Sequence, residues 1–338
     1  MGSNDLAAIA QQMVASGRGV LAADESNATI TKRFGALDIE SSEENRRAYR
    51  DTLLSTPGLE EYISGVILYD ETIRQCSSDG TPFPKMLDQK GILPGIKVDT
   101  GSKPLANAPD EQVTEGLDGL RDRIEEYVGM GAKFAKWRAV IVIGDGTPSD
   151  YAIGCNAHAL ARYAALCQEG GLVPIVEPEV LMDGDNDIDT CFEATVRTQR
   201  AVFAELARQR VDFERMILKP NMVISGKKCS EQADPDEVAE KTLKSLYATV
   251  PAAVPGIAFL SGGQSAAVAT EHLDLMNKKG PHPWTLTFSY GRALQDDALK
   301  TWKGDSENVG EAQKMASHRA KLTSAASSGN YSREMETV

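Results

Sequence analysis

Short apolar runs alternate with segments of helical spacing along the whole chain, and this alternation restricts the folds that the chain can adopt. Each run is rich in valine, isoleucine or aromatic residues and stops at a polar or charged residue. Parallel strands that are buried on both faces have this composition. The runs cover residues 19–24, 65–70, 95–99, 134–141, 172–180, 216–223, 256–263 and 285–291.

The segments between these runs have the spacing of amphipathic helices. In residues 117–128, leucine, isoleucine and valine recur at i, i+3, i+7 and i+11, which places them on one helix face. Ser41 followed by Glu44 predicts a capping box at the start of another helix. Because parallel strands need helical crossovers, eight strand–helix alternations predict a (β/α)8 TIM barrel, a fold of the α/β class.

A doubly wound open sheet shows the same alternation and is the alternative fold. The count of eight favours a closed barrel, and so does the lack of a G-x-G-x-x-G motif after the first run. No segment has the composition of an interdomain linker, so we expect one domain over residues 1–338. After residue 300 we expect a C-terminal helical extension, followed by a flexible tail over about residues 324–338.

Charge and composition make several partners and cofactors improbable. The net charge of −13 provides no positive field that would attract nucleic acid or an anionic membrane, so we expect neither as a partner. The five cysteines and four histidines are dispersed, without disulfide or metal-site spacing. We therefore expect no metal and no cofactor. With no signal peptide and no run long enough to cross a bilayer, the sequence predicts a cytoplasmic protein.

Charged residues gather at the ends of the predicted strands. In a barrel, catalytic side chains project from the carboxyl ends of strands, and residues at i and i+2 share a face. Structural ion pairs are the alternative explanation for any one pair of these charges. The charged residues at the strand ends are Asp24, Lys97, Asp99, Lys136, Arg138, Glu177, Glu179 and Lys219.

Lys219 is the most informative of these residues. It lies between Leu218 and Pro220, and the proline favours an extended backbone at Lys219. A free lysine amine is almost entirely protonated at pH 7, but burial beside other cations favours the neutral, nucleophilic form. A strand-end lysine is more often a surface or ion-pair residue, so Lys219 alone leaves both interpretations open.

Residues 260–265 read LSGGQS, and the first five letters match the signature of ATP-binding-cassette proteins. Such an ATPase also needs a Walker A loop, and the sequence contains no G-x-x-x-x-G-K-[ST]. Barrels commonly bind phosphate at the loops after strands seven and eight, where this segment and Arg292 lie. A tight strand–helix turn is the alternative explanation for Gly262 and Gly263.

Eight motifs together resemble those of class I fructose-bisphosphate aldolases over nearly the whole chain. Each motif is weak alone, but eight in the order of that family form a specific signal. The motifs are LAADES (21–26), GVILYDET (65–72), GIKVD (95–99), FAKWR (134–138), VPIVEPE (173–179), ILKPNMV (217–223), FLSGGQS (259–265) and TFSYGRAL (287–294).

The resemblance implies a metal-free carbon–carbon lyase of glycolysis and gluconeogenesis. It would reversibly cleave fructose 1,6-bisphosphate to dihydroxyacetone phosphate and glyceraldehyde 3-phosphate through a lysine Schiff base. It also implies a homo-oligomer, a tetramer in most of the family. The alternative is an aldolase-fold binding scaffold with little activity, because a fold does not determine a function.

The same resemblance assigns roles to individual residues. Lys219 would form the Schiff base, Glu177 would act as the acid–base group, and Lys136 would help to keep Lys219 neutral. Asp24 would act on the C4 hydroxyl or position the iminium, and Glu179 would hold the lysine cluster in place. The implied substrate-binding and phosphate-binding residues are Ser26, Thr29, Lys32, Arg33, Lys97, Arg138, Ser261, Gly262, Gly263, Ser289, Gly291 and Arg292.

The C-terminus departs from the family pattern. Vertebrate members end in a tyrosine that assists proton transfer, whereas this chain ends in Glu-Met-Glu-Thr-Val. The last tyrosine, Tyr331, lies seven residues before the end. We therefore expect a tail that does not carry the proton-transferring tyrosine of vertebrate members.

Overall fold

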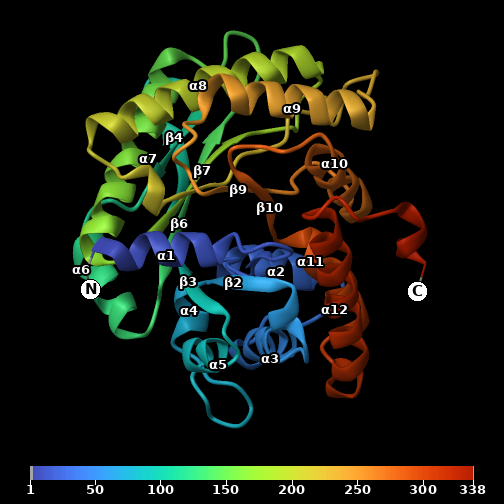
Figure 1. Ribbon diagram of the computed structural model, residues 1–338. Helices are drawn as coiled ribbons and strands as arrows, with labels where there is room; N and C mark the ends of the chain where they lie inside the picture. The colour runs from blue at the N-terminus through green and yellow to red at the C-terminus, as the bar shows by residue number, and fades with distance from the viewer. Residues whose placement is uncertain (1–2, 338) are drawn as a thin grey trace.

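The computed structural model describes residues 3–337, which form a closed barrel of eight parallel strands (Figure 1). The strand order around the ring is β1-β10-β9-β8-β7-β6-β3-β2. Because β1 pairs with both β2 and β10, the ring is closed and the open-sheet alternative is wrong. The strands are β1 (Gly19–Ala22), β2 (Ile63–Leu68), β3 (Leu93–Lys97), β6 (Phe134–Ile141), β7 (Val173–Val180), β8 (Ile217–Leu218), β9 (Gly256–Phe259) and β10 (Thr285–Tyr290).

Every predicted run contains one strand, but the sixth strand is much shorter than its run. β8 ends at Leu218, although the apolar run continues to residue 223. Pro220 has no amide hydrogen for a strand ladder. The amide of Lys219 still donates to the carbonyl oxygen of Val176, at 2.8 Å. The nucleophile candidate is therefore anchored to β7 at the point where its own strand ends.

An antiparallel hairpin between β3 and α6 was not predicted. It consists of β4 (Gly101–Leu105) and β5 (Ala108–Glu115). Most of its side chains are polar and at least partly exposed, so no apolar run marks it in the sequence. The turn contains Asn107 at a φ of 62°, a left-handed conformation that asparagine tolerates better than most residues.

Helices surround the barrel (Figure 1). Among the helices that the structure describes, none is both long and apolar enough to cross a membrane. The α-helices are α1 (Ser3–Met13), α2 (Asn27–Gly35), α3 (Glu43–Leu54), α4 (Asp70–Ile73), α5 (Phe83–Gln89), α6 (Leu120–Gly129), α7 (Asp150–Gly170), α8 (Ile188–Arg208), α9 (Pro235–Thr249), α10 (Ala266–Lys278), α11 (Arg292–Trp302) and α12 (Val309–Ala326). The 3₁₀ turns are Leu59–Glu61, Phe213–Arg215, Ser306–Asn308 and Arg333–Glu336.

Two predicted helix starts are displaced by their capping residues. The capping-box prediction at Ser41 is wrong, because Ser42 is the N-cap and its hydroxyl oxygen accepts from the amide of Asn45. The helix predicted over residues 117–128 begins at Leu120, after Gly119 in the left-handed region at a φ of 66°. The first helix therefore begins one residue later than the sequence pattern indicated, and the second begins three residues later.

Helix α1 closes the amino-terminal end of the barrel. Its apolar residues, including Leu6 and Met13, form one buried cluster with residues near the starts of the strands. Phe134 belongs to this cluster, and Gly95 on β3 leaves room for its ring. A Cβ atom on Gly95 would lie 2.3 Å from that ring, so a larger residue would displace the packing. With this end filled, only the carboxyl ends of the strands are available for a site.

The C-terminal segment lies against α10 and α12. The buried Tyr331 donates its amide hydrogen to Asp274 Oδ1 at 2.9 Å. Its hydroxyl donates to Glu336 Oε1 at 2.7 Å, and Glu336 also pairs with the buried Arg319. The predicted flexibility of residues 324–338 stays a prediction, and Val338 lies outside the described residues.

Candidate active site

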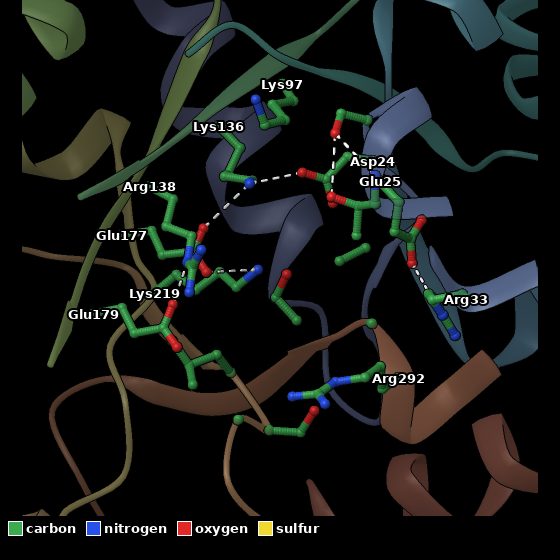
Figure 2. Close-up of a pocket in the computed structure, with 18 of the residues that line it drawn as sticks. Asp24, Glu25, Arg33, Lys97, Lys136, Arg138, Glu177, Glu179, Lys219 and Arg292 are labelled. Carbon is green, nitrogen blue, oxygen red and sulfur yellow. Dashed lines mark hydrogen bonds and ion pairs between the residues drawn. The ribbon is translucent and has the colours of Figure 1, made fainter. Parts of the chain in front are cut away.

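One pocket at the carboxyl ends of the strands contains almost all the predicted site residues (Figure 2). Its volume is about 570 Å³. Of the predicted site residues, only Gly263 is not part of its lining. The predicted residues that line it are Asp24, Ser26, Thr29, Lys32, Arg33, Lys97, Lys136, Arg138, Glu177, Glu179, Lys219, Ser261, Gly262, Ser289, Gly291 and Arg292.

Alternating carboxylates and amines form a chain across this pocket (Figure 2). Lys136 Nζ lies 2.6 Å from Asp24 Oδ2 and 3.4 Å from Glu177 Oε2. The other oxygen of Glu177, Oε1, lies 3.1 Å from Lys219 Nζ. Glu177 therefore contacts both lysines, one through each carboxylate oxygen.

The strand period explains how these side chains meet. Residues two apart on a strand share a face, so Glu177 and Glu179 both point to the mouth of the barrel. On the adjacent strand, Arg138 is the register partner of Glu177. Asp24 follows the end of β1, which lies across the ring from β6 and Lys136. Only a closed barrel brings Asp24 and Lys136 together.

Three of the four side chains in this chain of charges are almost fully removed from solvent, and Asp24 is 12% exposed. The exposed fraction is 5% for both lysines, Lys136 and Lys219, and 4% for Glu177. The surface interpretation of Lys219 is therefore wrong. Two ammonium groups and two carboxylates sum to no net charge, so their mutual attraction offsets part of the desolvation cost.

Burial shifts the pKa of Asp24 and of Lys136 in one direction, and the neighbouring charges shift each pKa in the other direction. Burial alone would raise the pKa of Asp24, but the charges of Lys136 and Lys219 outweigh it and hold the pKa at about 2. Burial would lower the pKa of Lys136, whereas Asp24 and Glu177 outweigh it and raise the pKa above its ordinary value. At neutral pH both groups are therefore ionised.

Two further ion pairs lie next to this chain. Arg138 pairs with Glu179, and Lys97 Nζ lies 2.7 Å from Asp99 Oδ1. Lys97 also donates to the backbone carbonyl of Asp99. Within residues 3–337, no ion pair joins Glu179 to either lysine, so its contact is with Arg138 rather than with the lysine cluster. The side chain of Arg138 is long enough to reach it from the neighbouring strand.

The predicted phosphate contact Arg33 has carboxylate partners of its own. It pairs with Glu25 and, at 2.7 Å, with Asp296 on α11. Glu25 also pairs with the buried Arg50, at 2.8 Å, and accepts from Gln295 Nε2. None of these four residues was predicted as part of the site: Glu25 and Asp296 contact Arg33 directly, and Arg50 and Gln295 contact Glu25. Only Glu25 could have been found from the sequence, because it stands beside Asp24 in the LAADES motif. Arg50, Gln295 and Asp296 lie within helices.

Several groups around the pocket have no partner of their own. Among the described residues, neither Lys32 nor Arg292 has an ion-pair partner, and both are exposed. Ser289 Oγ is buried, at 1% exposure for the residue, and makes no hydrogen bond within the described part of the chain. Buried polar atoms are rarely left unpaired, so a ligand atom is a suitable partner for Ser289.

The LSGGQS loop connects β9 to α10. Ser265 is the N-cap of α10, so the first free amide groups of that helix point toward the loop. Gly263 has a φ of 80°, and a Cβ atom there would lie 2.1 Å from Met182 Cγ. This position requires glycine. The tight-turn interpretation is therefore correct for Gly263, and it does not conflict with anion binding by the same backbone.

Comparisons with known proteins agree with this arrangement. The sequence model of the family described as fructose-bisphosphate aldolase class-I matches residues 5–338. The chain is 58% identical to a "probable fructose-bisphosphate aldolase class 1" of Xanthomonas campestris pv. campestris, over 98% of this chain and 99% of that protein. It is 52% identical to "fructose-bisphosphate aldolase 6, cytosolic" of Arabidopsis thaliana, over 97% of this chain and 92% of that protein.

A solved structure is similar over the same extent. It is a ternary complex of fructose-bisphosphate aldolase from Plasmodium falciparum with TRAP and a small-molecule inhibitor. The TM-score is 0.96 at 47% identity, and the match covers 98% of this chain and 96% of that one. Fold, motif order and sequence identity therefore lead to one conclusion: the chain belongs to the class I fructose-bisphosphate aldolase family.

Proposed function

We propose that this chain is an active enzyme that reversibly cleaves fructose 1,6-bisphosphate through a Schiff base on Lys219. The observation that carries the proposal is the position of the Lys219 amine, buried in the barrel mouth and 3.1 Å from a carboxylate. A carboxylate at that distance can accept a proton from the ammonium, which leaves a neutral amine as the nucleophile.

Schiff-base formation assigns a task to Glu177. The amine of Lys219 attacks the C2 carbonyl carbon of the open-chain substrate and forms a carbinolamine. Glu177 then returns a proton to the carbinolamine hydroxyl, which leaves as water, and an iminium remains. Lys136 stays protonated because of its raised pKa, so its charge stabilises the ionised form of Glu177 before the first transfer and again after the second.

Carbon–carbon cleavage follows from the iminium. A base removes the C4 hydroxyl proton, the C3–C4 bond breaks, and its electron pair moves to the iminium nitrogen as an enamine forms. Glyceraldehyde 3-phosphate leaves; protonation at C3 and hydrolysis then release dihydroxyacetone phosphate and free Lys219. Glu177 is the better candidate for this base, because Asp24, with a pKa of about 2, accepts a proton poorly at neutral pH. Asp24 instead stays ionised and holds Lys136.

The two phosphates of the substrate would bind at different parts of the pocket. The 1-phosphate would lie against the backbone of residues 261–263 and Gly291, with Arg292 as the cation. The 6-phosphate would lie near Ser26, Thr29 and Lys32, where α2 begins after β1. The support is the pocket lining, the helix N-termini and the unpaired cations, together with family membership.

Borohydride trapping tests the proposal. The protein is incubated with dihydroxyacetone phosphate and EDTA, treated with borohydride and digested, and the adduct is located by peptide mass spectrometry. The expected result is one stable adduct on Lys219, together with cleavage of fructose 1,6-bisphosphate in a coupled assay. A folded protein that gives neither an adduct nor cleavage would favour the binding-scaffold alternative.

The tail offers a separate prediction. Deleting residues 332–338 removes Glu336 and leaves the buried Arg319 and the Tyr331 hydroxyl without that partner. Because an unpaired buried polar group costs about 1–3 kcal/mol, we expect the free energy of unfolding to fall by about that amount. We expect kcat to be nearly unchanged, because none of residues 332–337 lines the pocket. Urea unfolding and steady-state kinetics measure the two quantities.

Glu336→Gln is the matched control for the deletion. It removes the charge opposite Arg319 but keeps the chain, so it should reproduce most of the stability loss. A large fall in kcat for the deletion, with no such fall for Glu336→Gln, would mean that the tail takes part in catalysis.

The assembly and location of the protein complete the proposal. A homotetramer in the cytosol is supported by family membership and, for the location, by the name of the Arabidopsis relative that is called cytosolic. Light scattering after size-exclusion chromatography measures the assembly.

A further inference from the structure

The side chain of Gln264 joins three parts of the molecule around the phosphate-binding loop. Its Oε1 lies 2.6 Å from His272 Nδ1 on α10. Its Nε2 donates to Met222 Sδ at 3.7 Å, and Met222 lies three residues after Lys219. Its backbone amide donates to the carbonyl of Ser261. Gln264 therefore connects the loop, the helix that follows it and the segment that carries the nucleophile.

The position of His272 determines which way the side-chain amide of Gln264 is oriented. The residue is 4% exposed and is not part of the pocket lining. Burial lowers the pKa of His272 to about 4, with Glu271 acting in the opposite direction. The ring is therefore neutral at pH 7, and a proton on Nδ1 can be donated to Gln264 Oε1. The amide hydrogens of Gln264 are then left for Met222 and not for the ring.

Within the described residues, few other side-chain hydrogen bonds hold this loop. Gly262 and Gly263 have no side chains, and glycine is the residue with the largest conformational freedom. The hydroxyl of Ser265 is used to cap α10. Among the described residues, Gln264 thus makes the main side-chain hydrogen bonds between the loop and the rest of the protein, beside the backbone hydrogen bond from Leu260 to Pro220 and the packing of Gly263 against Met182.

We propose that His272 is a positioning residue for phosphate binding. Through Gln264, His272 holds residues 261–263 in the conformation that directs their backbone toward the 1-phosphate of the substrate. The inference rests on the proposed function, since that function supplies the phosphate. It assigns no contact between His272 and the substrate.

The expected effect is on binding more than on the chemical step. The 1-phosphate does not change during the reaction, so contacts to it are alike in the substrate and the transition state. Loss of such uniform binding raises KM and leaves kcat nearly unchanged. A general loosening of the fold would instead change kcat, KM and stability together.

Comparing His272→Leu with His272→Asn distinguishes the effect of losing the hydrogen bond from the effect of changing the side-chain volume. Leucine fills the site without a donor and leaves Gln264 Oε1 unpaired. Asparagine can place its Nδ2 close to the former position of Nδ1 and donate again. We expect the KM for fructose 1,6-bisphosphate to rise about five- to tenfold in His272→Leu, as the loss of one buried hydrogen bond predicts. We expect a value near that of the parent in His272→Asn.

Measuring the affinity for each product needs no turnover, and it tests each end of the substrate separately. Calorimetry measures the Kd of dihydroxyacetone phosphate, which retains the 1-phosphate, and of glyceraldehyde 3-phosphate, which retains the other. In His272→Leu we expect weaker binding of the first and unchanged binding of the second. Asp274→Asn is the matched control, because Asp274 is buried on the same helix but contacts Tyr331 and Lys278 instead of the loop.

If His272→Leu is less stable than the parent, a double-mutant cycle still tests whether His272 acts through Gln264. Gln264→Met removes the acceptor, and combining it with His272→Leu should weaken phosphate binding no further than either change alone. Additive effects, or an unchanged Kd for dihydroxyacetone phosphate in His272→Leu, would overturn the inference. If the parent binds this compound but cleaves no substrate, the proposed function fails while these binding measurements still decide the role of His272. If the parent does not bind it, both fail.

Discussion

Lys219→Met is expected to remove cleavage of fructose 1,6-bisphosphate almost completely. Methionine has about the length of lysine without the amine, so the pocket stays filled while the nucleophile is lost. We expect kcat/KM to fall by at least about 10⁴-fold, because removing the nucleophile of a covalent mechanism costs up to about 10⁶-fold in other enzymes. The borohydride adduct should disappear as well. A coupled assay and peptide mass spectrometry measure the two results.

Lys136→Met is the matched control for this prediction. Lys136 is as buried as Lys219 and contacts the same carboxylate, Glu177, but it is not the nucleophile. We expect Lys136→Met to lower activity and still give an adduct on Lys219, because the attacking amine remains. Activity of Lys219→Met within tenfold of the parent, or an adduct on Lys136 in the parent, would overturn the assignment.

Glu177→Gln has the second largest expected effect. The amide keeps the shape of the side chain but neither accepts the proton of Lys219 nor returns it to the carbinolamine. General acid–base groups contribute about 10²–10⁴-fold, so we expect kcat to fall by about 10³-fold. Rapid-quench measurement of adduct formation should show that the iminium forms more slowly than in the parent, since this step needs both proton transfers by Glu177.

Glu179→Gln is the comparison for this carboxylate. Glu179 lies two residues further along β7 and pairs with Arg138, so this change should weaken substrate binding more than it slows the chemistry. If Glu179→Gln lowered kcat as much as Glu177→Gln, the two carboxylates would share the acid–base role. The assignment to Glu177 alone would then be wrong.

The repeating part of the fold was predictable because parallel barrel strands are buried on both faces. Burial requires apolar residues at consecutive positions, and such runs are visible without any knowledge of the partner strand. The β4–β5 hairpin was not predicted for the opposite reason: its residues are mostly polar, so no apolar run marks its strands, and its pairing is local. β8 was overestimated because an apolar run does not show where a proline ends the ladder.

The candidate site was predictable where charge interrupts an apolar run, as at Lys136, Glu177 and Lys219. A charged residue inside a buried strand needs a partner, so its position alone indicates a site. The partners of Arg33 were not predictable in this way. Arg50 and Asp296 lie on helices, where charged residues are common, and only the folded structure brings them to Glu25 and Arg33. The hydrogen bond between His272 and Gln264 was not predicted either, because only the folded structure shows that the two side chains meet.

The Asp24–Lys136 contact makes activity dependent on the completion of synthesis. Asp24 follows the first strand, but the ring that places it near Lys136 closes only when β10, over residues 285–290, pairs with β1. Arg292 lies still later in the chain. A ribosome-bound chain that ends before β10 has the nucleophile and its carboxylate but not the closed ring, and contacts so distant in sequence form slowly. Cleavage by a newly made chain would therefore report barrel closure, a folding event, and not merely the presence of the catalytic residues.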